Sequence, residues 1–250
     1  MKETSREPYY EGYIASYEKW LAAAPYVREV MARLMPLLGG AESMLDIGAG
    51  TGAISLAAPP CVKVTAVESS PAMLETFAAH ARKAGRDVRI IAEKWETADI
   101  AERAYDVVLC ANAVYSMEPL ADSLAKMVRA ARRAVLIVMN GRTEIGTYGK
   151  MRQALKATGI PCGAPPDVYT LGEVKDALGA IGAVYETSFA SWTDEVHFAD
   201  KDEVMRYLSA KLRFTLSEDA ERVLMPHLTE DAAALVLKND MTMAFLTVRV

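Results

Sequence analysis

The sequence predicts an α/β domain with three layers, in which helices cover both faces of a mostly parallel sheet. Segments with helical periodicity alternate along the chain with short apolar segments typical of buried strands. Strands joined through helices need right-handed crossovers, and these place helices on both faces of the sheet. The chain has 250 residues, a length that one sizeable core can occupy. We therefore expect residues 1–250 to form a single domain.

The composition is that of a globular protein from a reducing compartment. Apolar residues make up 52% of the chain and the mean hydropathy is +0.07, and no apolar run approaches the ~18 residues that cross a bilayer. Residues 1–7 are charged and lack the apolar core of a signal peptide. Cys61, Cys110 and Cys162 form no C-x-x-C pair, so we expect neither a disulfide framework nor a metal site. These features favour a cytoplasmic location and no membrane partner.

The charge of the chain weighs against a nucleic-acid partner. The net charge is −5 and the isoelectric point about 5.4, whereas a long nucleic-acid groove gains affinity by neutralising phosphates. Arg129, Arg132 and Arg133 form one local basic cluster. The last turn of a helix accounts for such a cluster, since the helix dipole favours cations there.

Residues 1–40 are expected to form two helices. Four aromatic residues are spaced by three, four and three positions, which places them on one helical face: Tyr10, Tyr13, Tyr17 and Trp20. A second helix is predicted from about Pro25 to Gly39-Gly40. The aromatic face either packs on the domain as ordinary core or closes over a ligand.

A glycine-rich turn after the first strand is the expected ligand site. Met44, Leu45 and Ile47 are typical of a buried strand, and the glycines that follow let the backbone turn tightly and approach a ligand. Gly48, Gly50 and Ala53 would also satisfy the dinucleotide pattern G-x-G-x-x-G/A, so the turn alone leaves two nucleotide ligands open.

Four further strands extend the predicted core over residues 41–140. The second, residues 62–67, ends in Glu68, whose carboxylate suits a ribose diol because it can accept both hydroxyl hydrogen bonds. The third is expected at residues 88–92 and the fourth at residues 106–112. A fifth follows at residues 134–139.

The last hundred residues carry weaker signals. A helix is predicted at residues 148–155 and another after the capping box of residues 170–173. Strand six is expected at residues 184–192 and strand seven at residues 243–250. Between them, residues 200–240 are predicted to form a helical insertion that either shapes a ligand pocket or forms a dimer surface.

Taken together, the motifs resemble those of the class I S-adenosylmethionine-dependent methyltransferases. The resemblance lies in Asp46 inside the first strand, G-x-G-x-G ending at Gly52, the acidic end of strand two and the apolar fourth strand. It is close over residues 43–139. It implies a seven-stranded sheet of order 3-2-1-4-5-7-6, with strand seven antiparallel, and S-adenosylmethionine as cofactor at the carboxyl ends of strands one, two and four.

The resemblance also implies which residues contact the cofactor. Gly48 and Gly50 would approach the methionine part, Asp46 would support its amino-acid end, and Glu68 would bind the ribose. Lys94 and Trp95 would border the adenine, with core packing as the alternative for Trp95. The implied cofactor-binding residues are Asp46, Gly48, Ala49, Gly50, Glu68, Ser69, Lys94, Trp95, Ala111 and Asn112.

The end of strand four distinguishes branches of the family. Adenine- and glutamine-modifying members carry Asn/Asp-Pro-Pro-Tyr/Phe there, whereas this chain has Asn112-Ala113-Val114-Tyr115. The sequence is more similar to the small-molecule branch of ubiquinone and menaquinone biosynthesis, in which an N-terminal helix closes over the acceptor. Candidate acceptor-site residues are Tyr13, Tyr17, Tyr115, Trp192 and His197. Tyr115 and His197 are also the candidate general bases, if the acceptor arrives protonated.

Three alternatives remain open from the sequence. Residues 200–240 could dock a protein acceptor, the domain could bind S-adenosylmethionine without turnover, or the glycine turn could belong to an NAD(P)-binding oxidoreductase. The oligomeric state and the methylated atom are not predicted.

Overall fold

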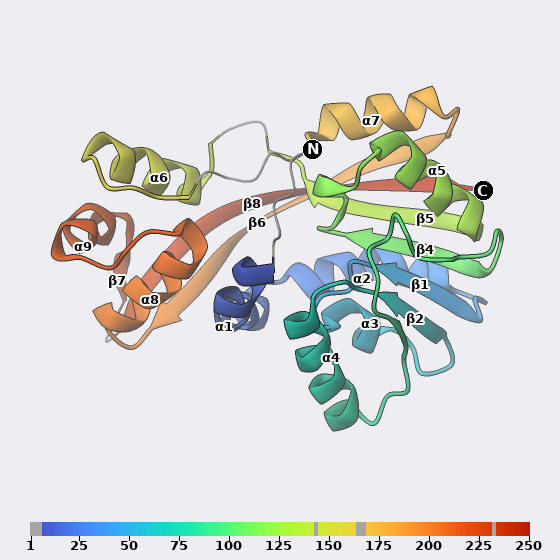
Figure 1. Cartoon of the computed structure of the whole chain (residues 1–250), viewed down its shortest axis with the longest axis horizontal. Coiled ribbons are helices and arrows are strands. Elements are labelled where there is room, and N and C mark those ends of the chain that lie inside the picture. The colour runs from blue at the N-terminus through green and yellow to red at the C-terminus, as the bar shows by residue number, and fades with distance from the viewer. Residues whose placement is uncertain (1–6, 143–144, 164–168, 232–233) are drawn as a thin grey trace.

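A computed structural model describes residues 7–142, 145–163, 169–231 and 234–250, without the side chains of residues 7–13 and 116. The chain forms a twisted sheet with helices on both faces (Figure 1). The sheet has eight strands in the order β3-β2-β1-β4-β5-β8-β6, and β7 pairs with β8. The strands are β1 (Ser43–Ile47), β2 (Lys63–Val67), β3 (Arg89–Ile91), β4 (Tyr105–Ala111), β5 (Ala131–Asn140), β6 (Tyr185–Phe198), β7 (Thr229–Asp231) and β8 (Ala234–Arg249).

The predicted strand order is confirmed. β6 and β8 correspond to the predicted strands six and seven, and β8 is antiparallel to both β5 and β6. The first five strands pair in parallel. The count is eight rather than seven because the short strand β7 adds to the edge of β8.

Helices cover both faces of the sheet. On one face α2, α3 and α4 pack against strands β1, β2 and β4, and on the other α5 and α7 pack against β4, β5 and β8. The helices of the described residues are α1 (Glu7–Ala23), α2 (Tyr26–Leu38), α3 (Ala53–Ala57), α4 (Pro71–Ala84), α5 (Leu120–Ala130), α6 (Thr147–Ala157), α7 (Leu171–Ala180), α8 (Lys201–Leu212) and α9 (Glu218–Leu224), with short 3-10 helices η1 (Val114–Ser116) and η2 (Met225–His227). No helix within these residues is both long and apolar enough to cross a membrane.

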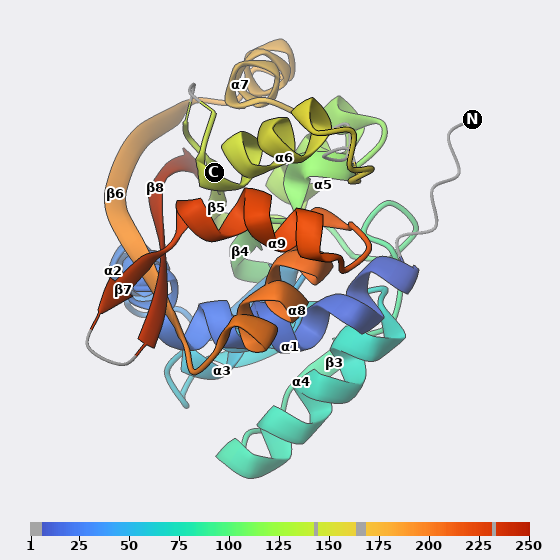
Figure 2. The ribbon, with the colours of Figure 1, turned by 90° about the vertical axis from the view of Figure 1, so that its left-hand side faces the viewer.

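β6 and β8 form a ribbon that extends beyond the rest of the sheet. They pair without interruption from Tyr185 opposite Val248 to Phe198 opposite Leu235. Helices α6, α8 and α9 gather on the far end of this ribbon around a separate apolar cluster (Figures 1 and 2). Both strands are longer than predicted, and the segment of residues 200–240 therefore holds β7 and the start of β8 as well as α8 and α9.

Helix α1 lies between the nucleotide-binding half of the sheet and this far end. Figure 2 shows it beside α8 and near α4. The Nζ of Lys19 lies 2.6 Å from Oε1 of Glu203 on α8. The Nε2 of His80 on α4 lies 3.4 Å from Oε2 of Glu18. Side-chain contacts on both flanks thus hold α1 in place.

Candidate functional site

The turn after β1 is fixed to the ends of both neighbouring strands. The backbone N–H groups of Gly48 and Ala49 donate to the carbonyl of Val67 at 2.8 and 3.2 Å. Gly48 has φ +68°, and a Cβ there would lie 2.3 Å from the Cβ of Ala113, which follows β4. Glycine is required at this position by both the backbone conformation and the close approach of the β4 end.

Gly50 has a different environment from Gly48. A Cβ built at Gly50 would meet only the Tyr17 hydroxyl oxygen, at 3.9 Å. Within the described residues, the buried hydroxyl of Thr51 in the same turn has no protein hydrogen-bond partner. The turn therefore offers bare backbone at Gly50 next to the Tyr17 hydroxyl and one unsatisfied polar atom at Thr51, an arrangement that suits a closely bound ligand.

Asp46 is a buried carboxyl group at the base of the turn. Its side chain is 2% exposed and accepts a hydrogen bond from the Ser55 hydroxyl at 2.5 Å. Burial raises the pKa of Asp46 to about 6, the Ser55 bond lowers it, and the negative charge of Glu68 raises it further. A positively charged ligand group near the turn would favour the ionised form.

Glu68 lies at the end of β2 beside the same turn. Its Oε2 accepts from the N–H of Gly50 at 2.9 Å, and its Oε1 accepts from the N–H groups of Ser69 and Ser70 at 2.8 Å each. The carboxylate is half-buried. Three hydrogen bonds from backbone N–H groups thus hold the Glu68 carboxylate, which is predicted to bind the ribose, against the glycine turn.

The Trp95 side chain lies in the core. It is 3% exposed, and its indole N–H donates to the carbonyl of Ser123 at 3.1 Å. The Nζ of Lys126, a residue of α5, lies 4.3 Å from the centre of the Trp95 ring. The Trp95 indole therefore packs in the core, which was the alternative to a place beside the adenine. Lys94 is exposed in the segment after β3.

Asn112 and Tyr115 form a hydrogen-bonded unit at the end of β4. Asn112 has φ +56°. The Tyr115 hydroxyl donates to Oδ1 of Asn112 at 3.1 Å and accepts from the N–H of Asn140 at 2.6 Å. Burial raises the pKa of Tyr115 to about 12, so the phenol stays neutral near pH 7. Its two hydrogen bonds join the β4 and β5 ends, which favours a positioning role, and its role as general base stays a prediction.

Replacing Tyr115 by Phe tests this assignment. Because the hydroxyl bridges two strand ends, we expect Tyr115→Phe to lower the free energy of unfolding by about 1–3 kcal/mol. The shape of the pH–rate profile should remain that of the wild type. Loss of a rise in rate toward alkaline pH would instead assign proton abstraction to Tyr115.

Trp192 and His197 lie on opposite faces of β6. Trp192 packs beside the α2 side of the sheet, and its indole N–H donates to Asp194 at 2.6 Å. His197 is exposed and alternates with the buried Val196 and Phe198. The sequence predicts both as acceptor-site residues, but positions an odd number apart on a strand face opposite ways, so β6 does not bring their side chains together.

Tyr17 is the predicted acceptor-site residue that reaches the glycine turn. Its ring centre lies 5.8 Å from that of Trp20. Trp20 in turn lies 5.1 Å from Tyr26 of α2, whose phenol is buried. The side chain of Tyr13 lies outside the described residues.

Sequence reasoning missed two charged residues, Asp194 and Lys211. Asp194 is 1% exposed on β6, and Lys211 of α8 approaches the Trp20 ring. The sequence did contain a sign of the first one. Asp194 alternates in step with Trp192 and Val196, so it is a charged residue on the inward face of a strand.

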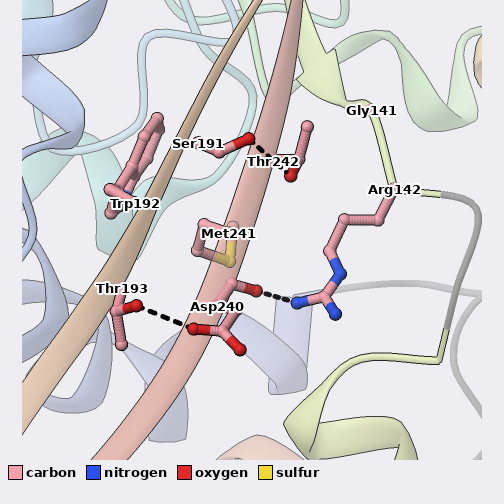
Figure 3. A pocket seen from close by; sticks show the side chains of 8 residues that line it. All are labelled: Gly141, Arg142, Ser191, Trp192, Thr193, Asp240, Met241 and Thr242. Carbon is pink, nitrogen blue, oxygen red and sulfur yellow. Dashed lines mark hydrogen bonds between the residues drawn. The ribbon is translucent and has the colours of Figure 1, made fainter.

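A hollow of about 490 Å³ lies on the outer face of the ribbon, beside the end of β5 (Figure 3). Arg142 donates to the carbonyl of Asp240, and Thr193 donates to the Asp240 carboxylate at 2.7 Å. The residues lining the hollow are Gly141, Arg142, Ser191, Trp192, Thr193, Asp240, Met241 and Thr242. Among the described residues, no group of three or more His, Cys, Asp or Glu side chains could hold a metal ion.

Comparisons with known proteins agree with this geometry. Residues 44–135 match the family described as "Methyltransferase domain". A 63-residue segment is 46% identical to the 23S rRNA (uracil(1939)-C(5))-methyltransferase RlmD of Chromohalobacter salexigens. That segment covers 25% of this chain and 13% of the curated relative.

Two solved structures share the fold over most of both chains. A Bacillus halodurans protein described as a methyltransferase has a TM-score of 0.61 and 16% identity, with 88% of this chain and 97% of that chain covered. The magnesium protoporphyrin IX methyltransferase of Synechocystis PCC 6803, solved with bound SAH, has a TM-score of 0.54 and 14% identity, with 98% and 97% covered.

Residues 44–135 are therefore similar to a methyltransferase domain, and the chain shares its fold with solved methyltransferases.

Proposed function

We propose that this protein transfers the methyl group of S-adenosylmethionine to a small-molecule acceptor. The observation that carries the proposal is the convergence of three strand ends beneath α1: the glycine turn after β1, Glu68 after β2, and Asn112 after β4. Open parallel sheets bind their ligands at this edge.

The described residues fit the cofactor. The bare backbone of Gly50 leaves room for the methionine part, and Glu68 would accept hydrogen bonds from the ribose hydroxyls. Asp46, when ionised, would complement a positive charge beside the turn. Ser69 and Lys94 remain predictions for the adenine end, and Ala111 with Asn112 for the neighbourhood of the methyl group.

In this reaction the protein would act mainly by aligning the reactants. In methyl transfer the acceptor donates an electron pair to the methyl carbon, the carbon–sulfur bond breaks, and its electrons return to sulfur. Holding reactants in line contributes ~7–11 kcal/mol to such reactions. Tyr115, Asn112 and Asn140 lock the β4 and β5 ends together, so these residues would serve to position the acceptor.

A small acceptor is favoured over a macromolecule because α1 covers the glycine turn. Tyr17 reaches over Gly50, while Trp20 and Tyr26 continue the aromatic wall. Aromatic walls with few polar groups are typical of small-molecule pockets. Transfer of radiolabel from the donor to protein or RNA, and not to small molecules, would contradict this choice.

Calorimetry against three ligands tests the cofactor assignment in the full chain. We expect S-adenosylmethionine and S-adenosylhomocysteine to bind and NAD to give no heat. Binding of NAD alone would favour the oxidoreductase alternative. Cofactor binding without methyl transfer to any extract fraction would favour a non-catalytic binding module.

Glu68→Gln should weaken S-adenosylmethionine binding about 10- to 100-fold, because it replaces a charge-assisted acceptor by a neutral amide. The dissociation constant from calorimetry is the measurement. Glu75→Gln, on the exposed face of α4, is the matched control and should bind like the wild type. Equal affinities for the two variants would remove Glu68 from the ribose site.

A further inference from the structure

His80 of α4 joins the glycine turn to α1. Its Nδ1 lies 3.2 Å from the carbonyl oxygen of Thr51, the residue between Gly50 and Gly52 in the turn. Its Nε2 lies 3.4 Å from Oε2 of Glu18 on α1. The two ring nitrogens therefore face oxygen atoms of two segments that are far apart in sequence, and a single side chain connects these segments.

Both neighbours of the His80 ring are hydrogen-bond acceptors. A neutral imidazole carries one N–H group and one lone pair, whereas an imidazolium carries two N–H groups. In either neutral tautomer, one ring nitrogen would present its lone pair to an oxygen atom. Both contacts become hydrogen bonds when the pair of side chains holds one further proton, which an imidazole accepts more readily than a carboxylate does.

The Glu18 carboxylate depends on the same ring. Among the described residues, the buried side-chain oxygens without a hydrogen-bond partner are Oε1 of Glu18 and Oγ1 of Thr51. Within the same part of the chain, His80 is the ion-pair partner of Glu18. Doubly protonated His80 would thus place a positive charge beside a half-buried carboxylate that has one oxygen unsatisfied, and each charge would stabilise the other.

The other titratable groups on the packed segments do not contact the ring in the described part of the chain. Helix α3, which packs beside α4, carries no titratable side chain. On α1, the Tyr17 hydroxyl lies near Gly50 and Lys19 pairs with α8. On α4 itself, the exposed Lys83 lies three residues beyond His80, and its positive charge opposes protonation of the ring only modestly.

We propose that His80 is a positioning residue for the cofactor, and that its doubly protonated form holds α1 over the glycine turn. Tyr17, the residue before Glu18, has its hydroxyl above the bare backbone of Gly50. Fixing Glu18 therefore fixes the part of α1 that covers the turn. Loss of the proton should release α1 and lower the affinity for the cofactor. This inference rests on the proposed function and adds a pH dependence to the same site.

The test is a double-mutant cycle in the full chain, made of the wild type, His80→Gln, Glu18→Gln and the double variant. The dissociation constant of S-adenosylhomocysteine is measured by calorimetry at about pH 5.5 and about pH 8.5, which span the ordinary titration range of histidine. The two side chains are 37% and 33% exposed. We therefore expect each single variant to bind about two- to fivefold more weakly at the lower pH. At the higher pH the coupling between the two positions should disappear.

The cycle removes the contributions of other groups that titrate in this range. The pKa of Asp46 is about 6 and that of Lys211 about 7. Both groups are present in all four proteins, so their effects cancel in the coupling between His80 and Glu18. His227→Gln, on η2, is the matched control and should bind like the wild type at both pH values. Denaturant unfolding of each variant checks that it is folded.

Hydrogen exchange of α1 in the ligand-free protein gives a second measurement that does not depend on the cofactor. The backbone amides of residues 14–23 should exchange faster in His80→Gln than in the wild type at the lower pH, because α1 is held less firmly. At the higher pH the two proteins should exchange alike, since the wild-type ring has then lost its second proton.

Distinct outcomes separate this inference from the proposed function. Coupling of equal size at both pH values, or none at either, would overturn the inference and leave cofactor binding in place. Faster exchange of α1 in the variant at both pH values would assign His80 to ordinary packing, which also contradicts it. If the wild type binds neither S-adenosylmethionine nor S-adenosylhomocysteine, the proposed function fails, and exchange of α1 still decides whether protonated His80 holds this helix.

Discussion

Gly48→Ala is expected to lower the free energy of unfolding by about 3 kcal/mol and to abolish S-adenosylmethionine binding. The added methyl group meets the Cβ of Ala113 at 2.3 Å, and the residue must hold φ +68°. Overpacking costs ~1–3 kcal/mol and the left-handed conformation ~1–2 kcal/mol for a residue with a Cβ. Denaturant unfolding and calorimetry measure the two effects.

Gly40→Ala separates the cost of the left-handed backbone conformation from the cost of the steric collision with Ala113. Gly40 also has φ +68°, but a Cβ there has no atom within 4 Å. It should therefore cost only the ~1–2 kcal/mol of backbone strain. Ala113→Gly combined with Gly48→Ala should recover the difference between the two variants. A double variant no more stable than Gly48→Ala would show that the collision is relieved elsewhere.

Asp194→Ala is expected to lower the free energy of unfolding by about 3–5 kcal/mol, the range for removing one partner of a buried ion pair. Two indole N–H groups, those of Trp20 and Trp192, lose their acceptor, and Lys211 loses a nearby negative charge. Thermal and denaturant unfolding are the measurements. Asp240→Ala, on the exposed face of the ribbon, is the control and should cost much less.

The same variant should change how stability depends on pH. The pKa of Lys211 is about 7 in the folded protein, below its ordinary value of 10.5. Between these values the unfolded chain binds more protons, so this group makes stability rise with pH across that window. Removing Asp194 lowers the folded pKa further, so the rise should begin at a lower pH. An unchanged pH dependence would mean that Asp194 does not act on Lys211.

The nucleotide-binding half could be predicted because its signals are local. Strands β1 and β2 are short, mostly apolar segments, and Gly48 and Gly52 follow β1 at fixed positions, so the strands and the turn were accessible, whereas the sheet order was implied by the family resemblance. Capping residues worked in the same way: Thr170 and Glu173 form the predicted capping box. These patterns depend on neighbours in sequence and need no tertiary information.

The full extent of the strands in the far half could not be predicted because it is set by tertiary partners. The segment Lys238-Asn239-Asp240 is polar, yet it continues β8 because β6 supplies the opposing strand throughout. Asp194 can be buried because Trp20 donates to it from α1, which is far away in sequence, and Trp192 donates from the same strand. The Trp95 indole was equally ambiguous, since its partner Ser123 lies on α5.

The place of β8 in the sheet also determines when the domain can be completed on the ribosome. Among the described residues β8 is the last strand in sequence, but it lies between β5 and β6 and pairs with β7 as well. Within the described residues β6 has no other sheet partner, so it stays an open edge until Ala234–Arg249 has emerged. The cofactor half, which ends with β5, can by contrast pair its own strands during synthesis. While β8 is still inside the ribosome, the nascent chain should thus hold a paired nucleotide-binding core and an incomplete apolar cluster around α6, α8 and α9, because that cluster also needs Leu237 of β8.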